Sequence, residues 1–363
     1  MIIKEISAIN FRNIDNCHVS LADGLNVFAG KNAQGKTNLL ETIFICAIGK
    51  SPRAVKIKDC LQWGKNYAYI KVILQKKTGN KIVEIKILEN GKKIILINGS
   101  PISSLSQLIG EINLVYFFPD DLKLVKEAPS DRRKFMDVDI SQASRLYFQN
   151  LIKYNKILAQ RNKLLKISQN IDDLKRTISL WDEQLSSCAG YIILSRIKFL
   201  KSLSPLAQKV HSILSGTNEN LTLQYVGEYG NSVEEIKDKI KISLMQNIEK
   251  DFALGYTSIG PHKDDIKIEL SGIDVRNFAS QGQQRTVSLA LKFAEIELFR
   301  NESGEMPIVL LDDVLSELDE FRRGQLLKMS SQVQTIITCT DASEIPKNAN
   351  IFYIDQGKIS KKP

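Results

Sequence analysis

The sequence contains few of the residues that build metal sites and disulfide frameworks. Its 363 residues include 5 cysteines and 3 histidines, and no two cysteines stand at CxxC spacing. The histidines, His18, His211 and His262, are too widely separated to indicate a metal site or a catalytic dyad. We therefore expect reduced thiols and histidines that serve packing.

Long uncharged apolar runs are also missing. None reaches the roughly 18 residues that a membrane-spanning helix needs, and charges interrupt the apolar segment 1–10. Hydrophobic residues make up 43% and charged residues 25% of the chain, which excludes disordered, collagen-like and disulfide-scaffold classes. These features predict a cytoplasmic globular protein without a membrane partner.

The net charge of +9 is unevenly distributed. Residues 1–130 hold 18 basic and 11 acidic side chains, residues 131–213 hold 15 and 7, and residues 214–363 hold 17 and 23. A basic first and middle part favours a polyanionic partner such as nucleic acid for one surface. A solvated charged face is the alternative.

The pattern of apolar residues predicts an α/β domain interrupted by helices. We expect strands at 2–10, 25–29, 67–98 (as a hairpin), 221–226, 266–270 and 307–311, a helix at 283–300, and two more strands near the end. From 171 onward, apolar residues follow the three-four spacing of a coiled-coil seam: Ile171, Leu174, Ile178, Trp181, Leu185, Cys188 and Ile192. Upstream, Leu151, Leu158 and Leu165 recur every seven residues, with Tyr147 and Tyr154 between them.

The polar break at 168–170 then predicts a helical hairpin, with arms of about 25 residues, or roughly 37 Å each. An ordinary helical subdomain would show the same seam. The predicted division is a domain of residues 1–130 and 255–363 with a helical arm of residues 131–254 inserted in it.

The strongest local motif is GKNAQGKT at 30–37, which matches G-x-x-x-x-G-K-[ST] between a predicted strand and a predicted helix. Its glycines let backbone N–H groups surround phosphate oxygens, Lys36 would reach the β- and γ-phosphates, and the Thr37 hydroxyl would contact Mg²⁺. A glycine-rich connection without a ligand is the alternative. The predicted nucleotide contacts are Gly30, Lys31, Asn32, Ala33, Gln34, Gly35, Lys36, Thr37 and Asn38.

A second motif, PIVLLDD at 307–313, joins a buried strand to two carboxylates. In this Walker B arrangement Asp312 would bind Mg²⁺, and Asp313 would polarise the attacking water as a catalytic residue beside Lys36. The motif is weak alone and strong beside the P-loop.

A third motif, SQGQQ at 280–284, begins the predicted 283–300 helix. Ser280, Gly282 and Gln283 would form an anion site at a helix N-terminus. Since the chain already has a phosphate site, this second one implies a second molecule. A plain N-cap with a turn glycine is the alternative.

In this order, the P-loop, SQGQ, LLDD and SELD (316–319) resemble the ABC-type head ATPases of the SMC-like repair group. Further motifs make the chain similar to the bacterial RecF family over essentially its whole length: NFRN at 10–13, GKTNLLETI at 35–43, FPDDL at 118–122, RRKFMD at 132–137 and GPHKDD at 260–265.

The resemblance implies an ATP- and Mg²⁺-binding head, a helical arm, and ATP-dependent head-to-head dimerisation in which Ser280 and Gly282 complete the partner's site. It also implies a weak, DNA-stimulated ATPase that clamps DNA at gaps, works in recombinational repair, and has RecR and indirectly RecO as partners. A nucleotide-binding subunit of a membrane transporter is the alternative function.

Several positions depart from the related patterns. Asp313 stands where transporter ATPases have Glu, which predicts slow turnover, and residues 338–341 (TCTD) replace a switch histidine. Lys263 stands where RecF chains commonly have Arg, Ser51–Arg53 differs from the usual Ser-His-Arg, and no glutamine is assigned to a Q-loop. Seven basic residues of the hairpin are candidate contacts to DNA phosphates: Lys153, Lys156, Arg161, Lys163, Lys166, Lys175 and Arg176.

Overall fold

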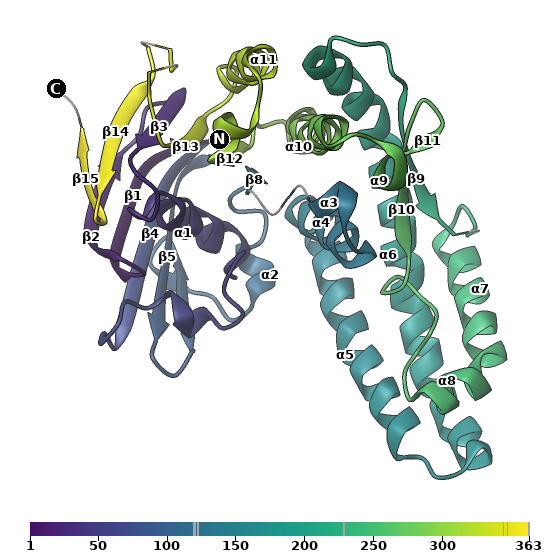
Figure 1. Cartoon of the computed structure of the whole chain (residues 1–363). Coiled ribbons are helices and arrows are strands. Elements are labelled where there is room, and N and C mark those ends of the chain that lie inside the picture. The colour runs from purple at the N-terminus through teal and green to yellow at the C-terminus, as the bar shows by residue number, and fades with distance from the viewer. Residues whose placement is uncertain (119–120, 122, 228, 344, 347, 362–363) are drawn as a thin grey trace. The chain divides into compact units, whose positions relative to one another are not determined.

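The computed structural model describes residues 1–361 except 119, 120, 122, 228, 344 and 347. It divides into two compact units, and Figure 1 labels most of their helices and strands. The head unit contains Met1–Leu122, Lys209–Asn218 and Arg285–Pro363, and the arm unit contains Lys123–Gln208 and Glu219–Gln284. The expected division differs from this one at 123–130, 209–218 and 255–284. Residues 265–270 fall in the arm unit because they pair with strand 221–226.

One sheet of the head unit is mainly parallel, and its four inner and far-edge strands at 25–29, 335–339, 308–312 and 114–117 are apolar runs buried on both faces, as in α/β proteins. Only the edge strand β15 runs antiparallel to its neighbour. The order across the sheet is β15 (Lys358–Lys361), β14 (Asn350–Asp355), β3 (Leu25–Ala29), β13 (Thr335–Cys339), β12 (Ile308–Asp312) and β8 (Leu114–Phe117). The expected strands at 25–29 and 307–311 and the two near the end are thereby confirmed, whereas β8 is an addition.

The other head sheet is antiparallel and alternates buried with exposed residues. Its order is β2 (Ile14–Ser20), β1 (Ile2–Phe11), β4 (Tyr67–Lys76), β5 (Gly79–Leu88), β6 (Lys93–Ile97) and β7 (Ser100–Pro101). The hairpin expected within 67–98 is β4–β5, and β6 extends it. The remaining head elements are α1 (Lys36–Ile48), η1 (Ile57–Cys60), α2 (Leu105–Leu108), most of α10 (Gln281–Ser303), η3 (Val314–Glu317) and α11 (Glu320–Ser330).

Helix α1 contacts strands of both head sheets, which explains why most of its residues are buried. The sheets are also joined by the buried side chain of Gln334, just before β13. Its Oε1 accepts a hydrogen bond from the Ile3 backbone N–H at 2.7 Å, and its Nε2 donates to the Ile3 carbonyl at 2.7 Å. Two layers thus hold the helix that follows the P-loop.

The arm unit contains the predicted helical hairpin, formed by α5 (Arg145–Ile167) and most of α6 (Ile171–Ser215), with the expected turn between them (Figure 1). The end of α6, from residue 209, belongs to the head unit. The arms are unequal: α5 has 23 residues, and α6 has 45 with Pro205 inside it, so the expectation of about 25 residues in each was wrong for α6. The other arm elements are α3 (Lys123–Lys126), α4 (Pro129–Ala143), β9 (Leu221–Val226), α7 (Val233–Gln246), α8 (Ile248–Leu254), β10 (Asp265–Leu270), β11 (Ile273–Asp274) and α9 (Val275–Phe278).

The hairpin core follows the predicted seam in α6 and follows it in part in α5. Leu174, Ile178 and Leu185 of α6 are buried. In α5 the predicted positions Tyr147, Tyr154 and Leu165 are buried, and so is Arg161, whereas the predicted positions 151 and 158 are half-buried.

Arg161 is the main correction to the predicted DNA surface. Its guanidinium is fully buried, lies 2.7 Å from carboxylate oxygens of both Asp182 and Asp251, and donates to Thr257 Oγ1 at 2.8 Å. The two carboxylates compensate its charge inside the arm core. Arg161 therefore cannot reach DNA phosphates.

Candidate nucleotide site

The P-loop connects β3 to α1 and leaves no room for side chains at its two glycines. A Cβ on Gly30 would lie 2.3 Å from the Ile354 carbonyl oxygen, and one on Gly35 would lie 2.7 Å from Asn13 Oδ1. Gly35 also has φ 109°, a left-handed conformation at the N-cap of α1. A hydrogen bond from the β14–β15 turn holds the loop: the Gly357 N–H donates to the Gln34 carbonyl at 2.9 Å.

Lys36 lies under this loop rather than in solvent. Its side chain is 4% exposed. The ammonium donates to the Gly30 carbonyl at 2.7 Å and stands 3.7 Å from Asp313 Oδ2. A cation held between the loop and the second Walker B carboxylate fits a site for the β- and γ-phosphates.

Asp312, at the end of β12, joins the two predicted motifs. Its Oδ1 accepts hydrogen bonds from Thr37 Oγ1 at 3.0 Å and from Thr338 Oγ1 at 2.6 Å. Burial raises the pKa of Asp312, and the bonds from Thr338 and Thr37 oppose that rise. A carboxylate and a hydroxyl in contact are the oxygen donors that Mg²⁺ prefers, so the residues present fit the metal.

Thr338 is a site residue that the sequence reasoning did not assign. It is the penultimate residue of β13 and lies directly beside Asp312 in the parallel register of β12 and β13. Besides bonding Asp312, its Oγ1 accepts a hydrogen bond from the Asp313 backbone N–H at 3.0 Å. Thr338 thus orients both Walker B residues.

Asp313 has an uncommon backbone conformation and one carboxylate oxygen that accepts no hydrogen bond among the described residues. Its φ is 50°, which is uncommon outside glycine. Its Oδ1 is buried and accepts no hydrogen bond within the part of the chain that the structure describes. This oxygen is available to hold a water molecule or accept a proton.

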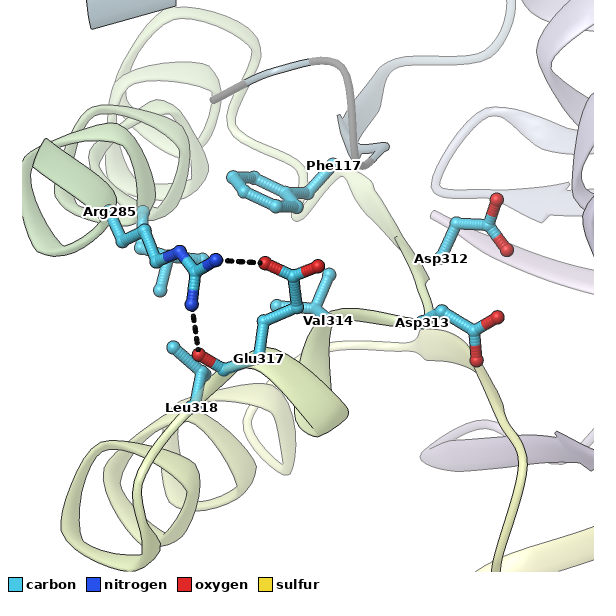
Figure 2. A pocket seen from close by; sticks show the side chains of 8 residues that line it. Phe117, Arg285, Asp312, Asp313, Val314, Glu317 and Leu318 are labelled. Carbon is cyan, nitrogen blue, oxygen red and sulfur yellow. Dashed lines mark hydrogen bonds and ion pairs between the residues drawn. The ribbon is translucent and has the colours of Figure 1, made fainter. Parts of the chain in front are cut away.

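A small cavity of about 20 Å³ adjoins the Walker B residues, which is room for one water molecule. Figure 2 shows Arg285 of α10 reaching across one side of it to Glu317 of η3. The guanidinium lies 2.8 Å from Glu317 Oε2 and donates to the Glu317 carbonyl at 3.0 Å. This pair ties the segment after Asp313 to the helix that follows the SQGQ motif.

A second polar cluster surrounds Glu41 on α1. Its buried carboxylate lies 2.9 Å from Arg12 Nη2 and 2.5 Å from Arg53 Nη2, and it accepts a hydrogen bond from Ser51 Oγ. Burial alone would raise the pKa of Glu41, but the bonds from Arg12 and Ser51 and the charge of Arg53 lower it. The NFRN and Ser-Pro-Arg segments therefore meet here.

The SQGQ motif forms a capped helix start. Ser280 Oγ accepts from the Gln283 N–H at 3.2 Å, and Gln283 Oε1 accepts from the Ser280 N–H at 3.0 Å, a reciprocal capping box. Ser280 and Gly282 are exposed, and a Cβ on Gly282 would meet nothing within 4 Å. The N-terminus of α10 is thus capped by side chains and accessible to solvent.

The GPHKDD segment organises the arm unit. His262 Nδ1 and the Tyr154 hydroxyl are 2.6 Å apart, and His262 Nε2 is 3.0 Å from the Thr257 carbonyl. Asp264 accepts hydrogen bonds from Tyr225 at 2.6 Å and Tyr229 at 2.8 Å. The segment therefore packs the arm, and His262 has the structural role that the sequence predicted.

Other predictions can be placed as well. The six remaining basic residues proposed for DNA are exposed on α5 and α6, and all five cysteines are free and buried. Among the described residues, no group of three His, Cys, Asp or Glu could hold a metal ion. In the FPDDL motif, residues 119, 120 and 122 lie outside the described residues.

Comparisons with known proteins agree with this architecture. The family model for the RecF/RecN/SMC N-terminal domain matches residues 2–360. Two curated relatives, both DNA replication and repair proteins RecF, come from Clostridium botulinum (strain ATCC 19397 / Type A) and Clostridium acetobutylicum. They are 41% and 43% identical to the chain, and each alignment covers 99% of the chain and 100% of the relative.

Solved structures give the same result. The recombination mediator protein RecF with ATPrS superimposes with a TM-score of 0.92 and 35% identity, over 99% of this chain and 98% of that one. An SMC head bound to the C-terminal winged-helix domain of ScpA shares the fold, with a TM-score of 0.61 and 15% identity over 100% and 98%.

The fold is thus that of the SMC-like ABC ATPase heads, as predicted. Within that class the chain belongs to the RecF family, whose curated members are DNA replication and repair proteins. The transporter alternative finds no support here. In the helices that the structure describes, none is long and apolar enough to cross a bilayer.

Proposed function

We propose that the chain is an ATP-gated DNA-binding protein of recombinational repair. Two copies would join head to head around ATP, hold DNA at a gap, and promote loading of recombination proteins, with RecR and indirectly RecO as partners. Slow hydrolysis would release the dimer. The related structures described as RecF with ATP and with ATPrS in the RecFOR pathway support this choice of nucleotide and pathway.

One observation carries the proposal: the P-loop and Walker B form a single hydrogen-bonded site. Thr37 and Thr338 both donate hydrogen bonds to the same carboxylate oxygen of Asp312. Lys36 stands beside Asp313. The P-loop N–H groups and Lys36 would bind the triphosphate, and Thr37 with Asp312 would hold Mg²⁺, which supplies charge neutralisation. Asp313 would orient the attacking water through its buried Oδ1.

The exposed helix start supports the proposed dimerisation. Ser280 and Gly282 are exposed at the positive end of α10, and a Cβ on Gly282 would meet nothing within 4 Å, so the helix start has room for the phosphate of a nucleotide bound by another copy. A phosphate shared by two half-sites makes the dimer depend on nucleotide state. The side chain of Asp313 is one methylene shorter than the Glu of transporter ATPases, which suits slow turnover.

The test compares two substitutions by light scattering, with and without Mg²⁺ and ATP. Lys36→Met should lose nucleotide binding or hydrolysis, since it removes the cation beneath the P-loop. Ser280→Arg should bind ATP normally and remain monomeric, because the long side chain blocks the helix start. If Ser280→Arg dimerises with ATP as the unaltered protein does, the signature assignment is wrong.

A further inference from the structure

The short turn η3, which follows Asp313, is held at its far end by two arginines. Arg285 of α10 donates from Nη1 to the Glu317 carbonyl at 3.0 Å, and Arg323 of α11 donates from Nη2 to the Leu318 carbonyl at 3.0 Å. The last carbonyls of a helical turn have no partner inside it and carry partial negative charge. Two cations from two different helices therefore fix this end of η3.

Arg285 also contacts a side chain of the same turn. Its Nη2 lies 2.8 Å from Glu317 Oε2, and Figure 2 draws both contacts of this guanidinium as dashed lines. The two side chains are 39% and 41% exposed, and an ion pair this open to water contributes little to stability. The planar fork of Arg285 instead fixes the position of η3, because two donors meet two acceptors of one residue.

Packing alone does not fix η3, because the cavity of about 20 Å³ lies beside it. Buried apolar side chains of Phe117, Leu289 and Val314 form part of the cavity wall, and Arg285 lines it as well. In Figure 2 the carboxylate of Asp313 points away from Arg285. Atoms that line a void lack partners on one side, so η3 has room to shift once its pair with α10 is broken.

Hydrogen bonds connect η3 to Asp313. Ser316, inside η3, donates from Oγ to the Asp313 carbonyl at 2.8 Å, and the Asp313 N–H donates to Thr338 Oγ1 at 3.0 Å. Asp313 has φ 50° and ψ 25°, a conformation that persists in a residue other than glycine only where its surroundings hold it. Release of η3 would let this backbone relax and move the carboxylate from its place 3.7 Å from Lys36.

We propose that Arg285 is a positioning residue for ATP hydrolysis. Bound to Glu317, it keeps η3 in place and so keeps the Asp313 carboxylate in the orientation that directs the attacking water. Arg285 acts through Asp313 and not through contact with the nucleotide. The inference rests on the proposed function, since it takes Asp313 as the residue that orients this water.

The experiment measures single-turnover hydrolysis of radiolabelled ATP by the full chain with Mg²⁺ and gapped DNA, and binding of a fluorescent ATP analogue. Arg285→Gln should lower the rate constant by roughly 10- to 100-fold, because a misplacement of about 1 Å has effects of that size. It should change nucleotide affinity by less than about threefold, since the lost interaction serves hydrolysis and not binding. Arg285→Lys keeps the charge without the planar fork, so its rate constant should lie between the two.

Arg300→Gln is the matched control. Arg300 lies on the same helix and forms an exposed ion pair with Glu297 at 3.3 Å, roughly 22 Å along α10 from Arg285. Its substitution removes the same charge from the same helix and should leave the rate constant unchanged. If Arg300→Gln slows hydrolysis as much as Arg285→Gln does, the effect belongs to the charge of α10 and the proposal is overturned.

A double substitution tests whether Arg285 acts through Asp313. If it does, Arg285→Gln should slow hydrolysis little further once Asp313→Asn has been made, because both changes remove the same contribution. Effects that multiply in the double variant would show that Arg285 acts by another route, which contradicts the proposal.

The outcomes separate this inference from the proposed function. If Asp313→Asn slows hydrolysis and Arg285→Gln does not, the positioning role falls and the proposed function stands. If Asp313→Asn leaves the rate constant unchanged, the role of Asp313 falls and the positioning role falls with it. If the unaltered protein neither binds nor hydrolyses ATP, the proposed function falls as well.

Discussion

The carboxylate of Asp312 is buried, and burial disfavours its ionised form. Burial raises its pKa despite hydrogen bonds from Thr338 and Thr37. The folded protein therefore binds this proton more tightly than the unfolded chain does. The resulting stabilisation is present below the ordinary pKa of aspartate and is lost as the pH rises through the raised value. Near neutral pH the ionised carboxylate of Asp312 destabilises the folded protein, and the same charge is what binds a cation.

Asp312→Asn should therefore stabilise the nucleotide-free protein and abolish its response to Mg²⁺ and ATP. The amide oxygen can accept both threonine hydrogen bonds without the buried charge. We expect the melting temperature to rise by roughly 2 °C without ligand and to gain little when Mg²⁺ and ATP are added. Thermal unfolding with and without ligand measures both effects.

Thr338→Val is the matched control. It removes a hydrogen bond that offsets the buried charge, so it should lower the melting temperature while Asp312 still binds the cation. A lower melting temperature for Asp312→Asn would show that the buried charge does not destabilise the site.

Individual elements could be predicted where the signal is local. The apolar run of β12 and the glycines before α1 give a strand and a phosphate loop without knowledge of the rest. Thr338 could not be assigned, because its role depends on the register that places it beside Asp312 in a neighbouring strand. In α5 the pattern could not show that Arg161 is buried, since Arg161 occupies a core position that the carboxylates of Asp182 and Asp251, distant in the sequence, make tolerable.

His262 gives the arm unit a dependence on acid. Burial is the main cause that lowers the pKa of its imidazole to about 4, and the neighbouring Lys263 and Arg133 act in the same direction. Between about pH 6.5 and 4 the unfolded chain binds a proton that the folded arm excludes. The arm should be fully stabilised above pH 6.5 and should lose stability as the pH falls toward 4.

His262→Gln should reduce this dependence by up to about 1.4 kcal/mol per pH unit. Urea unfolding of a Trp63→Phe protein, followed by Trp181 emission in the arm, gives the free energy of unfolding at each pH. The two proteins are compared by the slope of the free energy of unfolding against pH. Its absolute value is not compared, because the substitution also changes the bonds to Tyr154 and Thr257. Equal slopes for the two proteins would mean that His262 is not held neutral by burial.

Over the whole molecule, charge distribution and motif order identified the class of protein, but neither could show which surface meets DNA. The structure removes Arg161 from the candidates and leaves exposed cations on both units. Each phosphate contact made by a cation releases counterions, so the salt dependence of binding counts the contacts. Substitution of matched sets of lysines on the two units can therefore locate the surface.

The arm set is Lys156→Gln, Lys163→Gln and Lys166→Gln together, and the head set is Lys92→Gln, Lys328→Gln and Lys358→Gln; all six side chains are exposed. If the hairpin holds duplex DNA, the arm set should make the slope of log K against log salt concentration shallower by about 2 to 3. The head set changes the net charge equally and should leave the slope almost unchanged. The measurement is fluorescence anisotropy of gapped DNA with ATP across a salt series. An arm set with the same slope as the unaltered protein would exclude the hairpin as the DNA contact, because a lysine that contacts no phosphate releases no counterion.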